Sequence, residues 1–327
     1  MSGKLRIGII GCGDFLRLRA ADLLSSRQVE VKLLYSPVNS ANAERYAEIF
    51  GAKAADSPEA IINDPEIDVV CVCVPPFVRK EYVLAAAKAG KQIVATKPLA
   101  ADLSDAREMT EAVEQAGVRC GVIYRRTNNP VIEAYKEIFS GGEFGKLALY
   151  KQDWLHHYPT WNRWATDPKK NGGPFMDAML HNLNAARYLM GRRVVGRAFF
   201  SDDHTHSLAC DDTQFLKVDF EQGASAHLFI TWAAELAVYD SAKNDREHID
   251  QCFMVTDQGW LFRNEIREGK AVITATRNGL EKDFPVIPFE ETFFDRYAKE
   301  IKNRDMLPAD LPDIREAYED LRILLEN

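Results

Sequence analysis

Short apolar stretches alternate with amphipathic ones over the first 124 residues. The apolar stretches are continuous, which is typical of strands covered on both faces. They are residues 6–10, 29–35, 68–74, 92–96 and 119–124. Between them, apolar residues recur at helical spacing in residues 14–26, 42–50, 79–90 and 105–117. Strand–helix alternation at this pitch predicts an α/β domain with a doubly wound parallel sheet.

The pattern changes after residue 124. A predicted helix, strand and helix cover residues 130–142, 146–157 and 173–191. Strands with little helix between them follow, at residues 196–201, 212–220, 223–235, 250–257, 259–264 and 271–278. Two helices are expected near 289–303 and 311–325. The pattern predicts a second, α+β domain with a mainly antiparallel sheet, so we expect domains at 1–124 and 125–327.

Composition narrows the function class. The chain has 327 residues and a formal net charge of −8, with no large basic cluster, which disfavours nucleic acid as a partner and favours a small polar substrate. No apolar run approaches the ~20 residues of a membrane span, and the first apolar stretch breaks at Gly11, too early for a signal peptide. We therefore expect a cytoplasmic protein without a membrane partner.

Cysteine and histidine residues suggest no metal. The six cysteines are scattered and form no C-x-x-C pair, so buried thiols are expected rather than disulfides or zinc. His204 and His206 form a His-x-His pair in a predicted loop between strands. A metal there is not expected, because nothing else in the pattern needs one.

A phosphate-binding loop is predicted at the first strand–helix junction. Gly11 and Gly13 follow the strand and precede the helix, where backbone N–H groups can face a pyrophosphate. The alternative is a strand–helix turn with convenient glycines. Leu16 stands at the third glycine of the usual pattern, and it is expected to push the helix slightly outward. Asp14 and Phe15 are expected beside the cofactor, with Asp14 adding a like charge near phosphate.

The end of the second strand bears on cofactor choice. NAD enzymes place an acidic residue there to hold the ribose 2′-hydroxyl, whereas this chain has Ser36. Ser36, Asn39 and Ser40 can donate hydrogen bonds to a 2′-phosphate. The cofactor is therefore predicted to be NADP or NAD, with NADP favoured. Val74, Pro75, Lys97 and Pro98, which follow other strands, are also expected to line the cofactor site.

Several segments together resemble the glucose–fructose oxidoreductase / inositol dehydrogenase (Gfo/Idh/MocA) family. They are residues 72–106 with the signature Thr96-Lys97-Pro98, "YRRTNNP" at 124–130, "GGEFGK" at 141–146 and "GGPFMDAMLHNLNAARYLMG" at 172–191. The resemblance covers essentially the whole chain. It implies a Rossmann domain, then an open antiparallel sheet whose face often forms a homodimer or homotetramer. It also implies a cis Lys97–Pro98 bond and chemistry on a secondary alcohol of a sugar or cyclitol.

The chain departs from the family pattern at four positions. Thr96 replaces the glutamate of the Lys-Pro signature, and Ser36 replaces the acidic residue of the second strand. Arg19 and Arg79 stand where histidines are often found. These departures bear on the choice of cofactor, and with them the chain resembles an outlying member of the family.

Three residues are predicted to carry the chemistry. Asp177 and His181 lie four apart on a predicted helix and so share a face, although a surface pair would have the same spacing. Lys97 follows a strand, at the sheet edge where ligands sit in open α/β sheets, although it could also be a solvated lysine. In this hypothesis His181 exchanges the proton of the reacting hydroxyl, Lys97 polarises that oxygen, and Asp177 orients the substrate.

Further substrate contacts are predicted around these residues. Trp161 and Arg163 lie in a polar and aromatic loop that suits a sugar, although a loop clamping the domain junction fits equally. Tyr124 and Arg125 end the last strand of the first domain. The sequence thus predicts an NAD(P)-dependent oxidoreductase that transfers hydride between a nicotinamide and a secondary alcohol or ketone of a sugar, sugar derivative or cyclitol. The alternatives are a glycosidase or epimerase with transient oxidation, and a non-catalytic dinucleotide-sensing regulator.

Overall fold

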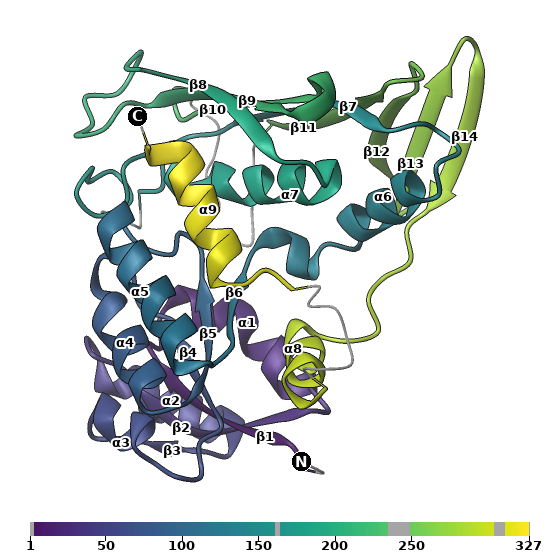
Figure 1. The fold of residues 1–327 in the computed structure, drawn as a ribbon. Helices are drawn as coiled ribbons and strands as arrows, with labels where there is room; N and C mark the ends of the chain where they lie inside the picture. The colour runs from purple at the N-terminus through teal and green to yellow at the C-terminus, as the bar shows by residue number, and fades with distance from the viewer. Residues whose placement is uncertain (1–2, 161–163, 235–248, 304–310, 327) are drawn as a thin grey trace. The chain divides into compact units, whose positions relative to one another are not determined.

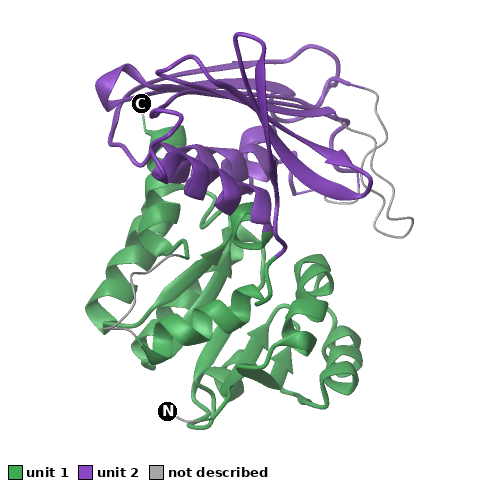
Figure 2. Ribbon diagram, turned by 90° about the vertical axis from the view of Figure 1, so that its right-hand side faces the viewer, with its two compact units in different colours: residues 1–128, 289–327 green, residues 129–288 purple. Residues whose placement is uncertain are grey.

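The chain folds into two compact units in a computed structural model that describes residues 3–160, 164–234, 249–303 and 311–326. Unit 1 comprises residues 1–128 and 289–327, and unit 2 comprises residues 129–288 (Figure 2). The sequence-based boundary at 124 lies close to the first crossing. The expectation that everything after it forms one domain is wrong, because residues 289–327 return to unit 1.

Unit 1 is built on a six-stranded sheet in the order β3-β2-β1-β4-β5-β6 (Figure 1), and all neighbouring strands are parallel. This is the predicted doubly wound sheet, with the addition of the two-residue strand β3. The strands are β1 (Leu5–Ile10), β2 (Val29–Tyr35), β3 (Lys53–Ala54), β4 (Val69–Val72), β5 (Gln92–Thr96) and β6 (Cys120–Ile123). The strand order reverses direction beside β1, which has β2 on one side and β4 on the other.

Helices and 3₁₀ turns connect these strands. They are α1 (Asp14–Ser25), α2 (Ser40–Phe50), α3 (Pro58–Ile62), η1 (Pro76–Val78), α4 (Lys80–Lys88), α5 (Leu103–Ala116) and η2 (Arg125–Asn128), with α8 (Phe293–Lys302) and α9 (Ile314–Leu325) from the end of the chain. Helix α8 contacts α1 and β2, and α9 contacts α5 and β6. The two closing helices therefore cover the Rossmann-type sheet.

Specific contacts explain why the closing helices return. The Tyr297 ring of α8 lies over Gly121 of β6, where an added Cβ would come within 2.7 Å of the ring. The Tyr297 hydroxyl donates to the backbone oxygens of Ile93 (2.5 Å) and Arg119 (3.0 Å). Asp295 accepts hydrogen bonds from the Ser26 hydroxyl (2.6 Å) and from two backbone N–H groups of the turn before β2.

Unit 2 is built on an eight-stranded sheet in the order β14-β13-β12-β11-β7-β10-β9-β8. All its neighbours are antiparallel except β7 and β10, so the predicted mainly antiparallel sheet is confirmed. Its strands are β7 (Leu147–Leu155), β8 (Val194–Asp202), β9 (Thr213–Phe220), β10 (Ser225–Thr231), β11 (Ile249–Thr256), β12 (Leu261–Arg267), β13 (Lys270–Arg277) and β14 (Leu280–Pro285). Strand β14 was not predicted.

Helices cover one face of the unit 2 sheet. They are α6 (Pro130–Ser140), a π-helical turn η3 (Phe175–Met179) and α7 (Leu180–Met190), with a 3₁₀ turn η4 (Glu221–Gly223) between β9 and β10. Helix α7 contacts β7 and β10. Ala226, Leu228 and Ile230 of β10 are buried, whereas Ser225, His227 and Phe229 between them are only partly buried. Alternation of this kind places the buried set on the helix-covered face.

The cysteines of the chain are free thiols. Of the six, Cys12, Cys71 and Cys120 are buried. Burial raises the pKa of the Cys12 thiol to about 12, so it is protonated at neutral pH. Among the described residues, no helix is long and apolar enough to cross a lipid bilayer.

Candidate cofactor and active site

Gly11 joins the end of β1 to the end of β4 by a very close backbone approach. Its φ is +103°, and an added Cβ would lie 2.8 Å from the carbonyl carbon and oxygen of Cys73. Its N–H donates to the backbone oxygen of Tyr35 (2.8 Å), at the end of β2. Only glycine fits here without strain. The loop lies where the strand order reverses, which is where open α/β sheets bind ligands.

The N-terminus of α1 has the form of an anion-binding site. Gly13 is the N-cap, no side chain caps the helix, and an added Cβ at Gly13 would meet no atom within 4 Å. The first-turn N–H groups of Asp14 and Phe15 belong to a helix of 12 residues, whose dipole favours a phosphate there. These residues fit the pyrophosphate of a dinucleotide.

Leu16 replaces the third glycine without leaving a gap. Its side chain is 1% exposed and packs in the unit 1 core with Ile9 and Cys12. The position that usually carries a small residue for helix–strand packing therefore carries a core leucine. Asp14 is mostly exposed and pairs with Arg17 one turn later, at 3.4 Å between Oδ1 and Nε. That pairing moderates the like charge that the sequence placed near the phosphate.

The residues expected at the ribose lie after β2. Ser36 is partly buried and follows the strand directly. Asn39 is exposed and caps α2, with its Oδ1 accepting from the backbone N–H of Ala41 (3.1 Å). The bond uses the oxygen of Asn39 and not its amide NH₂ group, which is the group that would donate to a 2′-phosphate.

Lys97 lies at the carboxyl end of β5. The Lys97–Pro98 peptide bond is cis, as the family resemblance implied. The Lys97 N–H donates to the backbone oxygen of Ile123 (3.4 Å), which ties this turn to the neighbouring end of β6. Lys97 is partly buried, and Pro98 and Leu99 after it are buried. The lysine therefore emerges from a fixed turn at the ligand-binding edge of the sheet.

The other unit 1 candidates differ in exposure. Val74 is 3% exposed and Pro75 is partly buried, both directly after β4. Tyr124 is 2% exposed, and its backbone oxygen accepts from the Thr127 hydroxyl (2.6 Å). Arg125 is exposed in the turn η2. Of the Tyr124–Arg125 pair, Arg125 is the side chain that can reach a ligand in solution.

In unit 2, Asp177 and His181 lie on a helix that does not begin as predicted. Residues Phe175–Met179 form a π-helical turn, in which the Leu180 N–H bonds to the Phe175 oxygen, and α7 starts at Leu180. The prediction of one regular α-helix is therefore wrong at its first turn. A π turn is wider than an α turn and is frequent at functional sites. Asp177 lies within it, and His181 lies in the first turn of α7.

Asp177 and His181 nevertheless share a degree of exposure that their neighbours lack. Between Gly173 and Ala186 every residue is buried except Asp177 and His181, which are both partly exposed. In this part of the helix, accessible surface therefore comes from the two predicted side chains. A pair on a solvated helix face, the alternative considered above, would have exposed neighbours.

A side chain from the same unit accepts a hydrogen bond from a backbone N–H group at the N-terminus of this helix. The Phe175 N–H donates to Oε1 of Gln214 in β9 (2.8 Å), and Gln214 is 6% exposed. An added Cβ at Gly173, whose φ is +102°, would lie 3.4 Å from the Asp211 oxygen. Sequence patterns missed Gln214, which lies 39 residues further along the chain. The predicted Trp161 and Arg163 lie outside the described residues.

Two histidines of unit 2 meet beyond the strand ends. His157 and His206 pack edge to face at 5.1 Å between ring centroids, with Tyr158 4.9 Å from His206. Asp212 is fully buried and accepts from the backbone N–H groups of residues 204–206. Burial raises the pKa of Asp212, but these bonds outweigh it and the net pKa is lowered. The described residues contain no group of three or more potential metal ligands.

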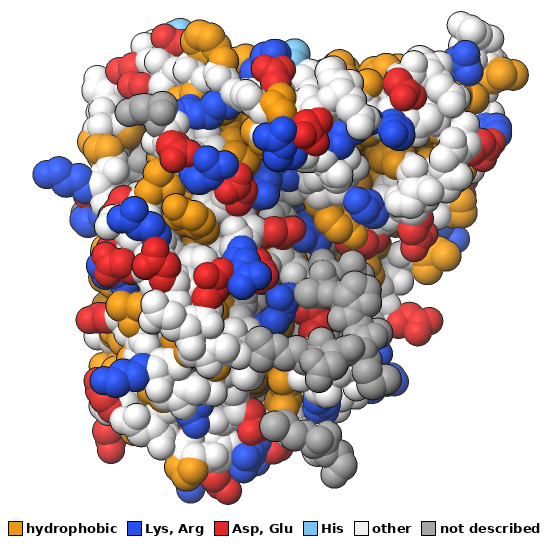
Figure 3. All heavy atoms as spheres, viewed as in Figure 1, with side chains coloured by type: hydrophobic (Ala, Val, Ile, Leu, Met, Phe, Trp, Pro, Cys, Tyr) orange, Lys and Arg blue, Asp and Glu red, His pale blue; other side chains and the backbone are white. Residues whose placement is uncertain are grey.

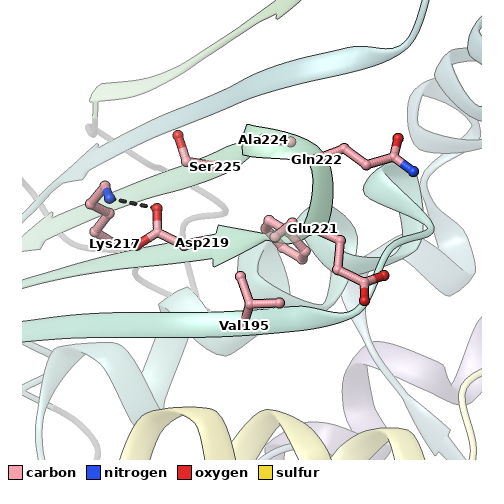
Figure 4. A pocket seen from close by; sticks show the side chains of 9 residues that line it. Val195, Lys217, Asp219, Glu221, Gln222, Ala224 and Ser225 are labelled. Carbon is pink, nitrogen blue, oxygen red and sulfur yellow. Dashed lines mark hydrogen bonds and ion pairs between the residues drawn. The ribbon is translucent and has the colours of Figure 1, made fainter.

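A pocket of about 840 Å³ lies elsewhere on unit 2, beside the turn from β9 to β10 (Figure 4). Lys217, Asp219 and Ser225 line it, and the first two form an ion pair at 2.5 Å. These residues alternate with the buried, helix-facing set of their strands. The pocket therefore lies on the sheet face opposite the helix of Asp177 and His181.

On the face shown in Figure 3, acidic and basic side chains are interspersed.

The sheet order, the open helix N-terminus and the close approach at Gly11 define unit 1 as a dinucleotide-binding Rossmann domain. Comparison with known proteins agrees. Residues 5–124 match the family described as "Oxidoreductase family, NAD-binding Rossmann fold", and residues 132–245 match the C-terminal domain of the same GFO/IDH/MocA family. The chain belongs to the GFO/IDH/MocA family and is an NAD(P)-dependent oxidoreductase.

Individual relatives match over most of their length. The chain is 25% identical over 313 residues to scyllo-inositol 2-dehydrogenase (NAD(+)) of Bacillus subtilis, covering 93% of this chain and 86% of that protein. It is 27% identical over 306 residues to myo-inositol 2-dehydrogenase of Thermotoga maritima, covering 91% and 86%. A putative NADPH-dependent oxidoreductase of Desulfitobacterium hafniense has the same fold, with a TM-score of 0.83 at 15% identity and coverage of 98% and 94%.

Proposed function

We propose that this chain transfers hydride between NAD(P) and a secondary alcohol or ketone of a sugar, sugar derivative or cyclitol. The observation that carries the proposal is the partial exposure of Asp177 and His181 between residues 173 and 186, where every other residue is buried. Support also comes from relatives named as inositol dehydrogenases and from Lys97 at the carboxyl edge of the Rossmann sheet. In this proposal unit 1 holds the cofactor and contributes Lys97 and Arg125 to the substrate site, and unit 2 contributes Asp177 and His181.

Unit 1 supplies the cofactor site in this proposal. The backbone of Gly11 and Gly13 and the first turn of α1, with Asp14 and Phe15, hold the pyrophosphate. The nicotinamide, when bound, supplies hydride acceptance or donation. The cofactor contacts that we propose also include Val74, Pro75, Lys97 and Pro98. Arg125 and Tyr124 stand at the neighbouring strand end, where Arg125 contacts the substrate.

Three side chains act on the substrate. His181 exchanges the proton of the reacting hydroxyl at an imidazole nitrogen, because imidazole titrates nearest to neutral pH. Lys97 hydrogen-bonds the same oxygen and stabilises negative charge that develops on it. Asp177 accepts a hydrogen bond from a neighbouring hydroxyl and so fixes the orientation of the ring. Sugars and cyclitols carry adjacent hydroxyl groups, which this division of roles requires.

Replacement of Lys97 tests the proposal. Wild type, Lys97→Met and the exposed-lysine control Lys88→Met are assayed with NAD⁺ or NADP⁺ against myo-inositol, scyllo-inositol and glucose. Loss of positioned acid–base and electrostatic help should lower kcat by ~10²–10⁴-fold in Lys97→Met only. With wild type, reduced cofactor should accumulate, because an enzyme that returns its hydride to the substrate would not release reduced cofactor. Unchanged turnover in Lys97→Met would end the proposal.

We propose NADP as the preferred cofactor. The support is Ser36 at the position where a carboxylate would repel a 2′-phosphate, with Asn39 nearby. At ~100 times its dissociation constant a ligand adds ~2.7 kcal/mol of stability. NADPH should therefore raise the melting temperature more than NADH at equal concentration. Equal shifts would contradict the preference.

We also propose a homodimer or homotetramer formed through the unit 2 sheet. The support is the set of large apolar side chains exposed on its strands, including Phe200 (58% exposed) and Ile266 (70%). Light scattering on the purified chain should give a multiple of 36.9 kDa. Phe200→Glu should shift the mass toward 36.9 kDa, and a monomeric wild type would contradict the proposal.

A further inference from the structure

Arg79 is a buried cation beside the predicted catalytic lysine. It follows the 3₁₀ turn η1 and is the N-cap residue of α4. Its side chain is 1% exposed. Burial lowers the pKa of its guanidinium to about 10, so the group remains charged at neutral pH.

The guanidinium binds backbone on both sides of Lys97. Nη1 donates to the carbonyl oxygens of Thr96 (2.6 Å) and Leu99 (3.0 Å), and also to that of Pro98. Nη2 donates to the oxygen of Val74 (2.7 Å), after the end of β4. One planar group therefore connects the carboxyl ends of β4 and β5.

Two other arginines of unit 1, Arg119 and Arg126, pair with carboxylates instead. Arg119 pairs with the carboxylates of Glu300 (2.7 Å) and Asp313 (3.4 Å). Arg126, 2% exposed, pairs with Glu316 (2.9 Å). The four acceptors of Arg79 are all backbone carbonyls. A buried charge is costly, and carbonyl dipoles offset that cost less fully than a carboxylate does. The Arg79 side chain therefore suits a role in holding these backbone segments in place.

We propose that Arg79 is the positioning residue for Lys97: its fork fixes the Thr96–Leu99 turn and so sets where the lysine amine meets the substrate. The inference rests on the proposed function, in which Lys97 acts on the reacting oxygen. A fixed turn matters because misplacing a catalytic group by ~1 Å can lower a rate by ~10²-fold. Arg79 itself does not touch the substrate.

The test compares Arg79→Met and Arg79→Lys with the control Arg119→Met, which removes a partly buried, carboxylate-paired arginine. Backbone amide hydrogen exchange is measured on the cofactor-free proteins. The peptide covering residues 96–101 should exchange faster in Arg79→Met than in wild type, while in Arg119→Met it should stay close to wild type. Arg79→Lys keeps a charged donor and should show intermediate exchange, which keeps the test available if Arg79→Met does not fold.

The kinetic part uses NADP⁺ or NAD⁺ with myo-inositol, or whichever of scyllo-inositol and glucose wild type turns over. In Arg79→Met, kcat should fall ~10–100-fold, with partial recovery in Arg79→Lys. Arg119→Met should keep kcat.

Wild-type exchange in the 96–101 peptide of Arg79→Met would overturn the inference, and so would equal kcat losses in Arg79→Met and Arg119→Met. The Lys97→Met variant separates the two proposals. Full activity in Lys97→Met would refute the proposed function. Loss of activity in Lys97→Met with unchanged kcat in Arg79→Met would refute only the positioning role.

Discussion

Two helices of this chain begin directly after a pair of glycines, and the two beginnings are built in opposite ways. Helix α1 starts after Gly11 and Gly13, with no side-chain cap and open space beside Gly13. The helix carrying Asp177 starts after Gly172 and Gly173, both at positive φ. There the first N–H groups face Gln214, which accepts from Phe175 within a buried setting.

The difference lies in what occupies the helix N–H groups. Any helix leaves its first N–H groups without partners inside the helix, so something else must satisfy them. In unit 2 a side chain from β9 does so, and that helix start is structural. In unit 1 no side chain caps the helix, and the loop lies at the switch point of the sheet. Paired glycines alone do not distinguish the two cases, whereas the partners of the N–H groups do.

The largest effect should come from Gly11→Ala. The added Cβ would lie 2.8 Å from backbone atoms of Cys73, which cannot move aside cheaply. Unfolding free energy should fall by ~3 kcal/mol, and the stabilisation of ~2.7 kcal/mol that cofactor gives at ~100 times its dissociation constant should largely disappear. Urea unfolding with and without NADPH measures both.

Gly117→Ala is the matched control for Gly11→Ala. Its φ is +64°, but an added Cβ meets no atom within 4 Å. It should lose only the ~1–2 kcal/mol of the left-handed conformation and keep full cofactor stabilisation. Equal behaviour of the two variants would show that the contact with Cys73 is unimportant.

Gln214→Leu should destabilise unit 2 without affecting the cofactor. It leaves the buried Phe175 N–H without its acceptor, so unfolding free energy should fall by ~1–3 kcal/mol. The control Ser201→Ala removes the other partner of Gln214, whose Nε2 donates to the Ser201 hydroxyl (3.3 Å), and should change stability by less than ~1 kcal/mol. A large loss of NADPH affinity in Gln214→Leu would contradict the view that the start of the unit 2 helix is structural and that the start of α1 binds the cofactor.

Gly13→Ala should show the opposite pattern. Its φ of −94° suits any residue and the added methyl meets no protein atom, so stability should change by less than ~0.5 kcal/mol. The methyl would occupy space that the pyrophosphate needs, and NADPH affinity should fall ~10-fold, or ~1.4 kcal/mol. Titration calorimetry measures this, and unchanged affinity would place the phosphates elsewhere.

The smallest effect should come from Asp14→Asn. Removing a mostly exposed negative charge beside the phosphate site should tighten NADPH binding ~2–5-fold at low salt. The gain should vanish at ~1 M salt, where screening acts within ~3 Å. The control is Glu111→Gln, which changes an exposed side chain of α5 and should leave NADPH binding unchanged. Weaker binding in Asp14→Asn would instead mean that the carboxylate contacts the cofactor as an acceptor.

Local patterns predicted most of the fold. The continuous apolar strands and the glycines after β1 were sufficient for the doubly wound sheet, because both signals are local in sequence. The return of residues 289–327 to unit 1 was missed. The amphipathic pattern of a helix indicates that one face is covered but not by which segment, and Tyr297 and Gly121 lie far apart in the sequence.

For the candidate site, the sequence named residues but did not give their local geometry. Lys97, Asp177 and His181 stay predictions as catalytic residues, and the π turn around Asp177 was not predicted, since one sequence spacing serves α and π turns alike. Arg79 was noticed only as a departure from the family pattern. Its role depends on carbonyl groups that lie 17–20 residues further along the chain, and backbone acceptors leave no trace in side-chain sequence.

The central claim is that an amine from unit 1 and an imidazole from unit 2 act on one substrate oxygen. A crystal structure of the chain with NADP⁺ and a polyol that it oxidises tests this most directly. We predict Lys97 Nζ and a ring nitrogen of His181 at ~2.6–3.2 Å from the same hydroxyl oxygen, beside the nicotinamide C4. A structure in which the two groups line separate cavities would contradict the account.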